Sequence, residues 1–276
     1  MAKYKRNWIT NKTVVISGAS SGMGREVTKI LINKYNCNVI GIGRNENKML
    51  SLIEELGDKK NNFSYQLFDV SKEENWISFK SHLNNNNISI DILINNAGIL
   101  PAFKSFEKHT VDEIKNTFDV NFFACIYSTL HLKPLIEKSS TPAIINISSS
   151  AALCPIVGGS IYSATKAALK NYTEAMRAEY KNKIYVGLIC PGLVKTDLFR
   201  NQTREKHSIV DKISMKSSTA ARKIVKGVHK QKRRYVIGVD AKFMDILYRV
   251  FPRSSINFIK TVLKASKLDL FNDIFN

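Results

Sequence analysis

Short apolar runs alternate with longer amphipathic stretches over most of the chain. β-Branched residues dominate the runs, which end in glycine or polar residues, as buried strands do. Between the runs, apolar positions recur every three or four residues, which indicates helices. Strands that alternate with helices predict an α/β fold in which a mostly parallel sheet carries helices on both faces. The expected strands lie at 13–17, 38–43, 63–68, 91–95 and 143–147, with a sixth before Pro191 and an edge strand at 235–238.

A glycine-rich turn joins the first strand to the first helix, and it reads Gly18-Ala-Ser-Ser-Gly22-Met-Gly24. Glycines let the backbone bend sharply and approach a pyrophosphate, while the helix N-terminus supplies partly positive N–H groups. Strand, turn and helix in this order are typical of a Rossmann-type, doubly wound sheet, here with seven strands. The expected cofactor contacts in this turn are Gly18, Ser20, Ser21, Gly22, Met23 and Gly24.

The second strand ends in Gly43 and Arg44. An acidic residue at this point binds the ribose hydroxyls of NAD, whereas an arginine accommodates the 2′-phosphate of NADP. Arg44 therefore favours NADP(H) as the cofactor. A solvated arginine at a strand end, with NAD(H) as the cofactor, is the alternative.

Further candidate cofactor contacts follow the third and fourth strands, because ligands bind at the carboxyl ends of parallel strands. As single residues, Asp69 and Asn95 could equally be turn formers. The candidates are Asp69, Val70, Asn95, Ala97 and Gly98.

Bulk composition narrows the class of protein. With 276 residues and 44% hydrophobic residues, we expect a single domain over 1–276, with a core at about 12–240 and an extension at 241–276. No apolar run is long enough to span a membrane, and the basic N-terminus does not lead into a signal-like apolar segment. The four cysteines are far apart, which predicts no metal site and reduced thiols in a cytoplasmic protein. The net charge of +19 could attract nucleic acid or anionic membrane, or reflect only a lysine-rich composition.

A candidate for acid–base chemistry lies in the helix expected at about 162–180. Tyr162 and Lys166 are four residues apart and share a face of that helix. A lysine cation beside a phenol stabilises the phenolate and lowers the tyrosine pKa from about 10. Such a tyrosine can protonate a carbonyl oxygen or deprotonate an alcohol. Taken alone, the pair could also be an ordinary contact on a helix surface.

Several motifs in this order resemble the short-chain dehydrogenase/reductase family, in its single-domain, NADP-preferring branch. The resemblance covers residues 12–240, and the departures are Ser17 in place of threonine and Ala152 in place of glycine. The motifs that carry it are Ser17-Gly-Ala-Ser-Ser-Gly-Met-Gly24, Asn95-Asn-Ala-Gly98, Asn121 in a helix expected at 111–135, Ile147-Ser-Ser149, Tyr162-x-x-x-Lys166, and Pro191-Gly192 through Thr196.

The resemblance implies a catalytic tetrad of Asn121, Ser149, Tyr162 and Lys166. Ser149 would hydrogen-bond the substrate carbonyl and Tyr162 would protonate it. Lys166 would lower the tyrosine pKa and hold the nicotinamide ribose, and Asn121 would support a proton-relaying water. Sequence physics alone does not separate Ser149 from the serines on either side. The resemblance adds Tyr162, Lys166, Pro191, Gly192, Val194 and Thr196 to the cofactor contacts, and places a lid over the substrate at 197–215.

The extension at 241–276 predicts two basic amphipathic helices separated at Pro252. Such helices could pack over an apolar substrate pocket or against a second subunit, or lie on an anionic membrane. A pocket or a membrane contact would suit a bulky apolar substrate.

These features favour an NADP(H)-dependent oxidoreductase that transfers a hydride between nicotinamide and a ketone, an aldehyde or a secondary alcohol. A cofactor-binding regulatory protein without turnover is the alternative. A nucleic-acid-binding protein is a third possibility, suggested only by the charge. Against it, the basic residues after Lys226 adjoin an edge strand and include no array of stacking aromatic residues. The resemblance implies a homo-dimer or tetramer formed through the helices at 111–135 and 162–180.

Overall fold

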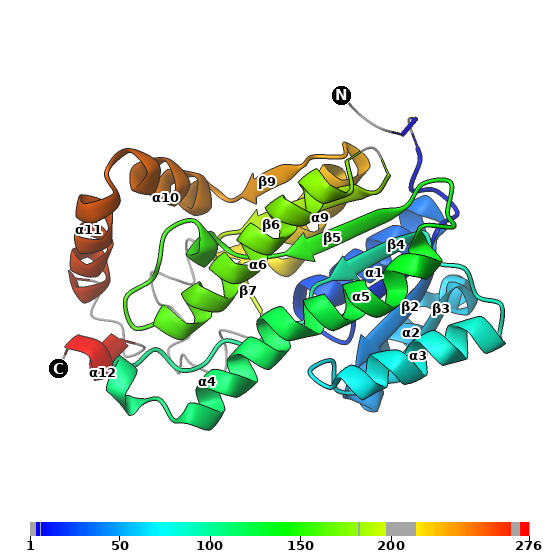
Figure 1. Ribbon diagram of the computed structural model, residues 1–276, viewed down its shortest axis with the longest axis horizontal. Helices are drawn as coiled ribbons and strands as arrows, with labels where there is room; N and C mark the ends of the chain where they lie inside the picture. Colours follow the sequence, from blue (N-terminus) through cyan, green and yellow to red (C-terminus); the bar gives the residue numbers. More distant parts are fainter. Residues whose placement is uncertain (1–3, 6, 182, 197–213, 266–270, 276) are drawn as a thin grey trace.

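Seven strands form one parallel sheet in the order β3-β2-β1-β4-β5-β6-β9 (Figure 1). The fold is taken from a computed structural model, which describes residues 4–5, 7–181, 183–196, 214–265 and 271–275. Each pair of neighbouring strands is parallel in the described residues, so the predicted seven-stranded α/β sheet is confirmed. The strands are β1 (Thr13–Ser17), β2 (Asn38–Gly43), β3 (Phe63–Leu67), β4 (Ile92–Asn95), β5 (Ala143–Ile147), β6 (Tyr185–Pro191) and β9 (Arg234–Ile237).

Helices cover both faces of the sheet, which is why the strands are apolar throughout. Along β1, Val14 and Ile16 belong to one core and Val15 belongs to the other. The first core includes residues of α1 (Gly22–Tyr35), α2 (Glu46–Leu56) and α9 (Ser217–His229). The second core includes residues of α3 (Glu73–Asn85), α5 (Ala124–Ile136) and α6 (Ser160–Glu179).

The helix expected at 111–135 is interrupted near its middle. It consists of α4 (Val111–Phe118), a π-helical turn at Asp119–Phe123, and α5. Asn121 lies in this π turn and is fully buried. Short 3₁₀ turns occur at Gly57–Asn62, Phe106–Lys108 and Ser150–Ala152.

Three helices follow the sheet, at the side where its strands have their carboxyl ends (Figure 1). They are α10 (Val239–Val250), α11 (Pro252–Ala265) and α12 (Asn272–Phe275), so the expected break at Pro252 is confirmed. A two-stranded parallel ribbon pairs β7 (Val194–Lys195) with β8 (Met215–Lys216). Most of the expected lid, residues 197–213, lies outside the described residues. Within the described chain, no helix is both long and apolar enough to cross a membrane.

Candidate active site

The turn between β1 and α1 is closed by direct contacts with the segment that follows β4. The Ser17 hydroxyl accepts hydrogen bonds from the backbone N–H groups of Asn96 (3.0 Å) and Ala97 (3.1 Å). Gly18 has a φ of +72°, and a Cβ there would lie 3.0 Å from the Ala97 Cα. Gly22 also has a positive φ, of +54°. A side chain at Gly18 would therefore suffer both backbone strain and collision with Ala97.

Three adjoining hollows run along the carboxyl ends of the strands, and together we name them the groove. The first hollow, which contains Arg44, and the second, which contains Lys166, are both lined by the glycine turn. Tyr162 lines both the second hollow and the third, which contains Ser149. The predicted site residues on the first and second hollows are Gly18, Ser20, Ser21, Gly22, Met23, Arg44, Asp69, Val70, Ala97, Gly98, Tyr162, Lys166 and Thr196. Those on the third hollow are Met23, Ser149, Tyr162, Pro191, Gly192, Val194 and Thr196.

Three predicted residues lie behind the groove wall. Gly24 packs against the Gly18 carbonyl, where a Cβ would collide, so it lets α1 approach the turn. Asn121 is fully buried behind Gly98, whose added Cβ would lie 3.1 Å from the Asn121 Oδ1. Asn95 was expected at the cofactor, but it is buried and both ends of its side-chain amide are used in the core.

The Asn95 amide belongs to a buried chain of polar groups. Its Oδ1 accepts from the Ser128 hydroxyl (2.7 Å), and its Nδ2 donates to Asn146 Oδ1 (2.8 Å). Asn146 Nδ2 in turn donates to the Thr173 hydroxyl (2.9 Å). Buried polar groups need such partners, and here the partners tie β4 to α5, β5 and α6.

Arg44 and Asp69 form the outer end of the first hollow. The Arg44 side chain is 71% exposed, and its Nη1 lies 3.9 Å from Asp69 Oδ2. The backbone N–H and the hydroxyl of Ser71 both donate to Asp69 Oδ1. Burial raises the pKa of Asp69, but the Ser71 hydrogen bonds and the Arg44 charge lower it overall. Gly43 leaves the end of β2 without a carboxylate.

Tyr162, Lys166 and Ser149 meet where the second and third hollows join. The Lys166 Nζ lies 5.8 Å from the centroid of the Tyr162 ring. It also lies 3.4 Å from the Ile147 carbonyl oxygen, to which it donates. The Ser149 side chain lines the third hollow together with the Tyr162 phenol, and its oxygen accepts from the Ala151 N–H (3.2 Å). The neighbouring Ser148 hydroxyl instead donates to the Lys166 backbone carbonyl (2.9 Å).

Burial sets the pKa values of this pair. It raises the pKa of Tyr162, although the hydrogen bond from Ser149 lowers it, and it lowers the pKa of Lys166. Each shift favours the neutral form of its own group, the phenol of Tyr162 or the amine of Lys166. We expected Lys166 to lower the pKa of Tyr162, but burial is the larger influence and raises this pKa overall.

Asn121 is fixed by the backbone that leads out of β4. Its Oδ1 accepts from the Ile99 N–H (2.8 Å), and its Nδ2 donates to the Ile99 carbonyl (2.9 Å). The same Nδ2 lies 3.2 Å from the Thr165 hydroxyl, one residue before Lys166. The amide thus connects the π turn to the segment after β4 and to α6.

The groove has the chemistry that a nicotinamide dinucleotide requires. Gly18, Gly22 and Gly98 leave its floor free of side chains, and α1 begins there with the partly positive N-terminus that binds phosphate. Arg44 places a cation at one end, and Lys166 and Tyr162 lie at the other. These residues fit a phosphate-bearing dinucleotide. Among the described residues, no cluster of His, Cys, Asp and Glu could hold a metal ion.

The third hollow has an apolar outer side that sequence reasoning missed. Leu100, Phe103 and Ile156 line it, and residues of the C-terminal segment pack behind them. The Phe103 and Phe271 rings are 5.2 Å apart, and Phe271 is 5% exposed. Ile274 fills the space beside Gly158, and Lys108 pairs with Asp273 (3.4 Å). These contacts join residues that are far apart in sequence, so no local pattern could have revealed them.

Other groove residues were also missed. Asn96 lines the second hollow and donates through Nδ2 to the Ser17 carbonyl (3.0 Å). Its place beside Asn95 was the available signal, since alternate residues after a strand face opposite ways. Ile147 and Leu193 also line the groove, directly next to predicted residues.

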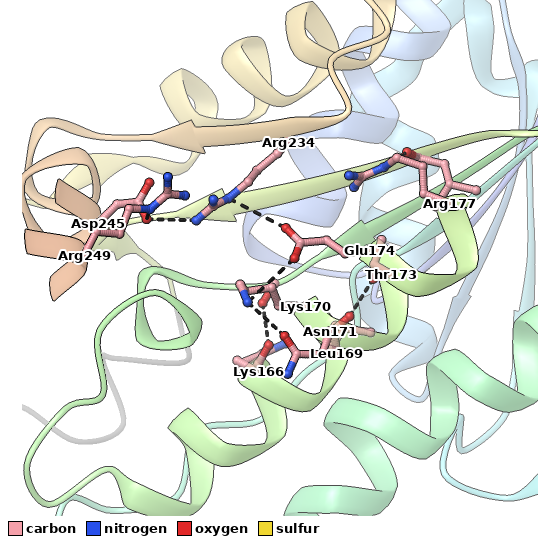
Figure 2. A network of polar contacts seen from close by, with 12 residues as sticks. Lys166, Leu169, Lys170, Asn171, Thr173, Glu174, Arg177, Arg234, Asp245 and Arg249 are labelled. Atoms are coloured by element: carbon pink, nitrogen blue, oxygen red, sulfur yellow. Dashed lines mark hydrogen bonds and ion pairs between the residues drawn. The ribbon is translucent and has the colours of Figure 1, made fainter. Parts of the chain in front are cut away.

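The far half of α6 is tied to α10 through Arg234 of β9, as Figure 2 shows. The Arg234 Nε lies 3.9 Å from Glu174, and its Nη2 lies 2.8 Å from Asp245. Arg249 also pairs with Asp245 (2.9 Å). The helix that carries Tyr162 and Lys166 is therefore held by polar contacts along its length.

The sequence and the fold both resemble those of known proteins. Residues 12–207 match the family described as short chain dehydrogenase. The chain is 31% identical over 260 residues to a probable short-chain type dehydrogenase/reductase, VdlC, of Helicobacter pylori, covering 87% of this chain and 93% of that protein. It is 30% identical over 223 residues to the 11-beta-hydroxysteroid dehydrogenase-like 2 of Arabidopsis thaliana, covering 80% of this chain and 71% of that protein.

Among solved structures, the fold is similar to that of a short chain dehydrogenase from Burkholderia cenocepacia in complex with NADP. The TM-score is 0.76 at 20% identity, covering 91% of this chain and 98% of the other. It is also similar to a serine dehydrogenase complexed with NADP⁺, with a TM-score of 0.71 at 24% identity, covering 82% and 94% of the two chains.

Proposed function

The chain belongs to the short-chain dehydrogenase/reductase family, and from that premise we propose that it is an NADP(H)-dependent reductase of ketones or aldehydes, which also oxidises the matching secondary alcohols. Members of this family are oxidoreductases that act on alcohol or carbonyl groups with a nicotinamide cofactor. One observation carries the proposal: the Tyr162 phenol, which shares a hollow with Ser149 and lies close to Lys166, is on the same groove as the glycine turn.

We assign the roles of the tetrad from these contacts. When bound, the nicotinamide supplies the hydride that the carbonyl carbon accepts. The Ser149 hydroxyl donates a hydrogen bond to the substrate oxygen, and the Tyr162 phenol protonates it. Because burial keeps Tyr162 protonated, it is ready to act as the acid in the reducing direction. Lys166 and Asn121 position the site, Lys166 through the nicotinamide ribose and Asn121 through Ile99 and Thr165.

The preference for NADP(H) rests on Arg44. Its exposed guanidinium, at the end of a strand that carries no carboxylate, is suited to bind a 2′-phosphate. Two similar structures contain NADP, which supports the same cofactor here. NAD(H) is the alternative cofactor.

The substrate that we propose is bulky and apolar. Leu100, Phe103 and Ile156 form an apolar wall beside Ser149 and Tyr162, and Phe271 and Ile274 pack behind that wall. A relative named for a hydroxysteroid supports this class of substrate.

Assembly and location are also proposed. We propose a single domain over 1–276 that forms a homo-dimer or tetramer through α4, α5 and α6. Exposed apolar side chains on α4 and α5, at Val111 and Leu130, support that interface. The four cysteines, all within the described chain, are buried and free of disulfides, which supports a cytoplasmic location.

A spectrophotometric screen tests the proposal. NADPH and NADH oxidation would be followed against a panel of ketones and aldehydes, with wild-type protein and with Tyr162→Phe. We expect turnover with NADPH, and loss of the acid should lower kcat by about 10²–10⁴-fold. NADPH binding by fluorescence serves as the control that Tyr162→Phe keeps its fold.

Three outcomes would count against parts of this assignment. Equal use of NADH would contradict the role of Arg44. Undiminished turnover by Tyr162→Phe would contradict the role of the phenol. Binding of NADPH without turnover of any carbonyl would favour the regulatory alternative.

A further inference from the structure

The outer side of α10 and α11 exposes an unusual amount of apolar surface. Of the fourteen large hydrophobic side chains exposed in the described chain, seven lie between residues 239 and 262. Exposed apolar surface of this extent marks an interaction site in a folded protein. We name these seven the apolar stripe: Val239, Phe243, Ile246, Val250, Phe251, Phe258 and Val262.

Helical spacing places most of the stripe on one side of α10. Val239, Phe243, Ile246 and Val250 are separated by four, three and four residues, so they share one face. The Phe243 ring lies 6.3 Å from the ring of Phe258, which continues the stripe onto α11.

The inward side of α10 is fixed by contacts with the sheet. Ala241 is fully buried, and Asp245 points to Arg234 of β9 (Figure 2). The Asp240 carboxylate accepts a hydrogen bond from the Leu193 N–H (2.7 Å). With α10 anchored on this side, rotation that would bury the stripe is prevented.

The charges that flank the stripe are positive. The two acidic residues of these helices, Asp240 and Asp245, are directed inward by the contacts above. Lys and Arg side chains on the same helices are exposed. They are Lys242, Arg249, Arg253, Lys260 and Lys264.

We propose that α10 and α11 bind an anionic lipid surface, with both helices lying in its plane. An apolar face flanked by Lys and Arg is the composition of helices that bind at the boundary of headgroups and acyl chains. A second copy of the chain suits the stripe less well. A two-fold interface would set the same patch against itself and bring its cations together.

Docking in this way would place the groove next to the lipid. Leu263 of α11 packs in the same cluster as Phe103, which lines the third hollow. A lipid-soluble substrate would then have a short path to Tyr162. This consequence rests on the proposed function, whereas the docking itself does not.

Vesicle co-sedimentation tests the docking with the full chain. The vesicles contain equal parts of phosphatidylcholine and phosphatidylserine, or phosphatidylcholine alone, at low and at high salt. We expect binding to the anionic vesicles that weakens with salt. Phe243→Ser with Ile246→Ser should abolish it, while the matched substitution Ile77→Ser, of an exposed residue on α3, should not.

The basic residues supply a second arm of the experiment. Lys242→Gln should weaken binding about fivefold, from about 1 kcal/mol per cation near an anionic surface. The matched control is Lys223→Gln, an exposed lysine of α9, which should have a smaller effect. All variants should retain NADPH binding, which confirms that they are folded.

Several results would overturn the proposal. One is failure of the wild-type protein to bind anionic vesicles at low salt. Another is an equal loss for Lys223→Gln and Lys242→Gln, which would show attraction by net charge alone. A third is sedimentation data in which Phe243→Ser with Ile246→Ser dissociates an oligomer and leaves vesicle binding intact, which would identify the stripe as a subunit interface.

Discussion

Ser148 and Ser149 are adjacent in the chain but contact different groups. Both serines line the groove, but Ser148 is buried and donates to the backbone carbonyl of Lys166, whereas Ser149 lies beside the Tyr162 phenol and lowers its pKa. Alternation along an extended backbone accounts for the difference, because successive side chains point to opposite sides. This supports Ser149 as the serine that contacts substrate and Ser148 as a support for α6.

The two serines can be separated by paired substitutions. Ser149→Ala should lower kcat by about 100-fold or more, because it removes a hydrogen bond to the developing charge on the substrate oxygen. Ser148→Ala should instead lower the free energy of unfolding by about 1 kcal/mol, because it removes a buried hydrogen bond. Steady-state kinetics and urea unfolding measure the two effects. The opposite pattern would move the catalytic role to Ser148.

Burial changes what could be inferred about Tyr162 from its spacing. The four-residue interval correctly placed Tyr162 and Lys166 together, since that follows from helical geometry alone. The direction of the tyrosine pKa did not follow, because it depends on how deeply the rest of the chain buries the phenol. Asn95 shows the same limit. A local motif does not reveal that Ser128 and Asn146 occupy its amide.

The C-terminal segment is the element with the clearest effect on specificity. Phe271 packs against Phe103 on the apolar side of the third hollow. Phe271→Ala should therefore raise KM for bulky apolar ketones about tenfold, while KM for small ketones and for NADPH stays nearly unchanged. The factor corresponds to roughly 1–3 kcal/mol of lost apolar contact. Steady-state kinetics without vesicles is the measurement.

A matched aromatic substitution makes that experiment specific. Phe258→Ala removes an exposed ring from α11, away from the third hollow, and should leave all KM values unchanged. Equal KM values for the wild-type protein and Phe271→Ala would show that the segment does not shape the pocket.

Elements with local signals were predictable, and elements held by distant contacts were not. Pro252 separates α10 from α11 because its ring cannot continue a helix. The π turn at Asp119–Phe123 carries no comparable signal, since its apolar pattern also suits a regular helix. The sequence predicts basic amphipathic helices here, but which residues of α10 are exposed, among them Val239, Ile246 and Val250, depends on how β9 anchors the helix.

For the whole molecule, buried thiols predict how stability depends on pH. Burial raises the pKa of Cys37 and of Cys125 to about 11, and the pKa of Cys190 to about 12. An unfolded thiol has a pKa of about 8.5. Between pH 9 and about 11, the folded protein therefore binds more protons than the unfolded chain. Folding stability is full below this range and falls as the pH rises through it.

Urea unfolding at several pH values measures this fall. Each thiol should contribute a slope of up to about 1.4 kcal/mol per pH unit. Cys125→Ala should remove the contribution of that thiol to the slope. The buried tyrosines contribute to the slope that remains. A free energy of unfolding that stays constant between pH 8 and 11 would contradict the shifts.

The sheet was the most predictable feature of the whole molecule. Each strand is an apolar run between helices of the expected spacing, and right-handed crossovers leave few topologies for such an order. The groove then follows, because parallel strands deliver their loops to one edge. The apolar wall that includes Phe103 was not predictable in the same way. It depends on contacts with a segment more than 150 residues away in the chain.

The π turn also sets the direction in which each side chain of α5 faces. One residue corresponds to about 100° of rotation about a helix axis. A π turn holds one residue more than the α-helical turn it replaces, so if Asp119–Phe123 formed a regular helix with no residue removed, α5 would turn by about that angle relative to α4. Ser128 would then swing away from Asn95, and Leu132 would leave the core. Regularising this turn at full chain length would do more harm than most single replacements, because every inward position downstream would lose its register together.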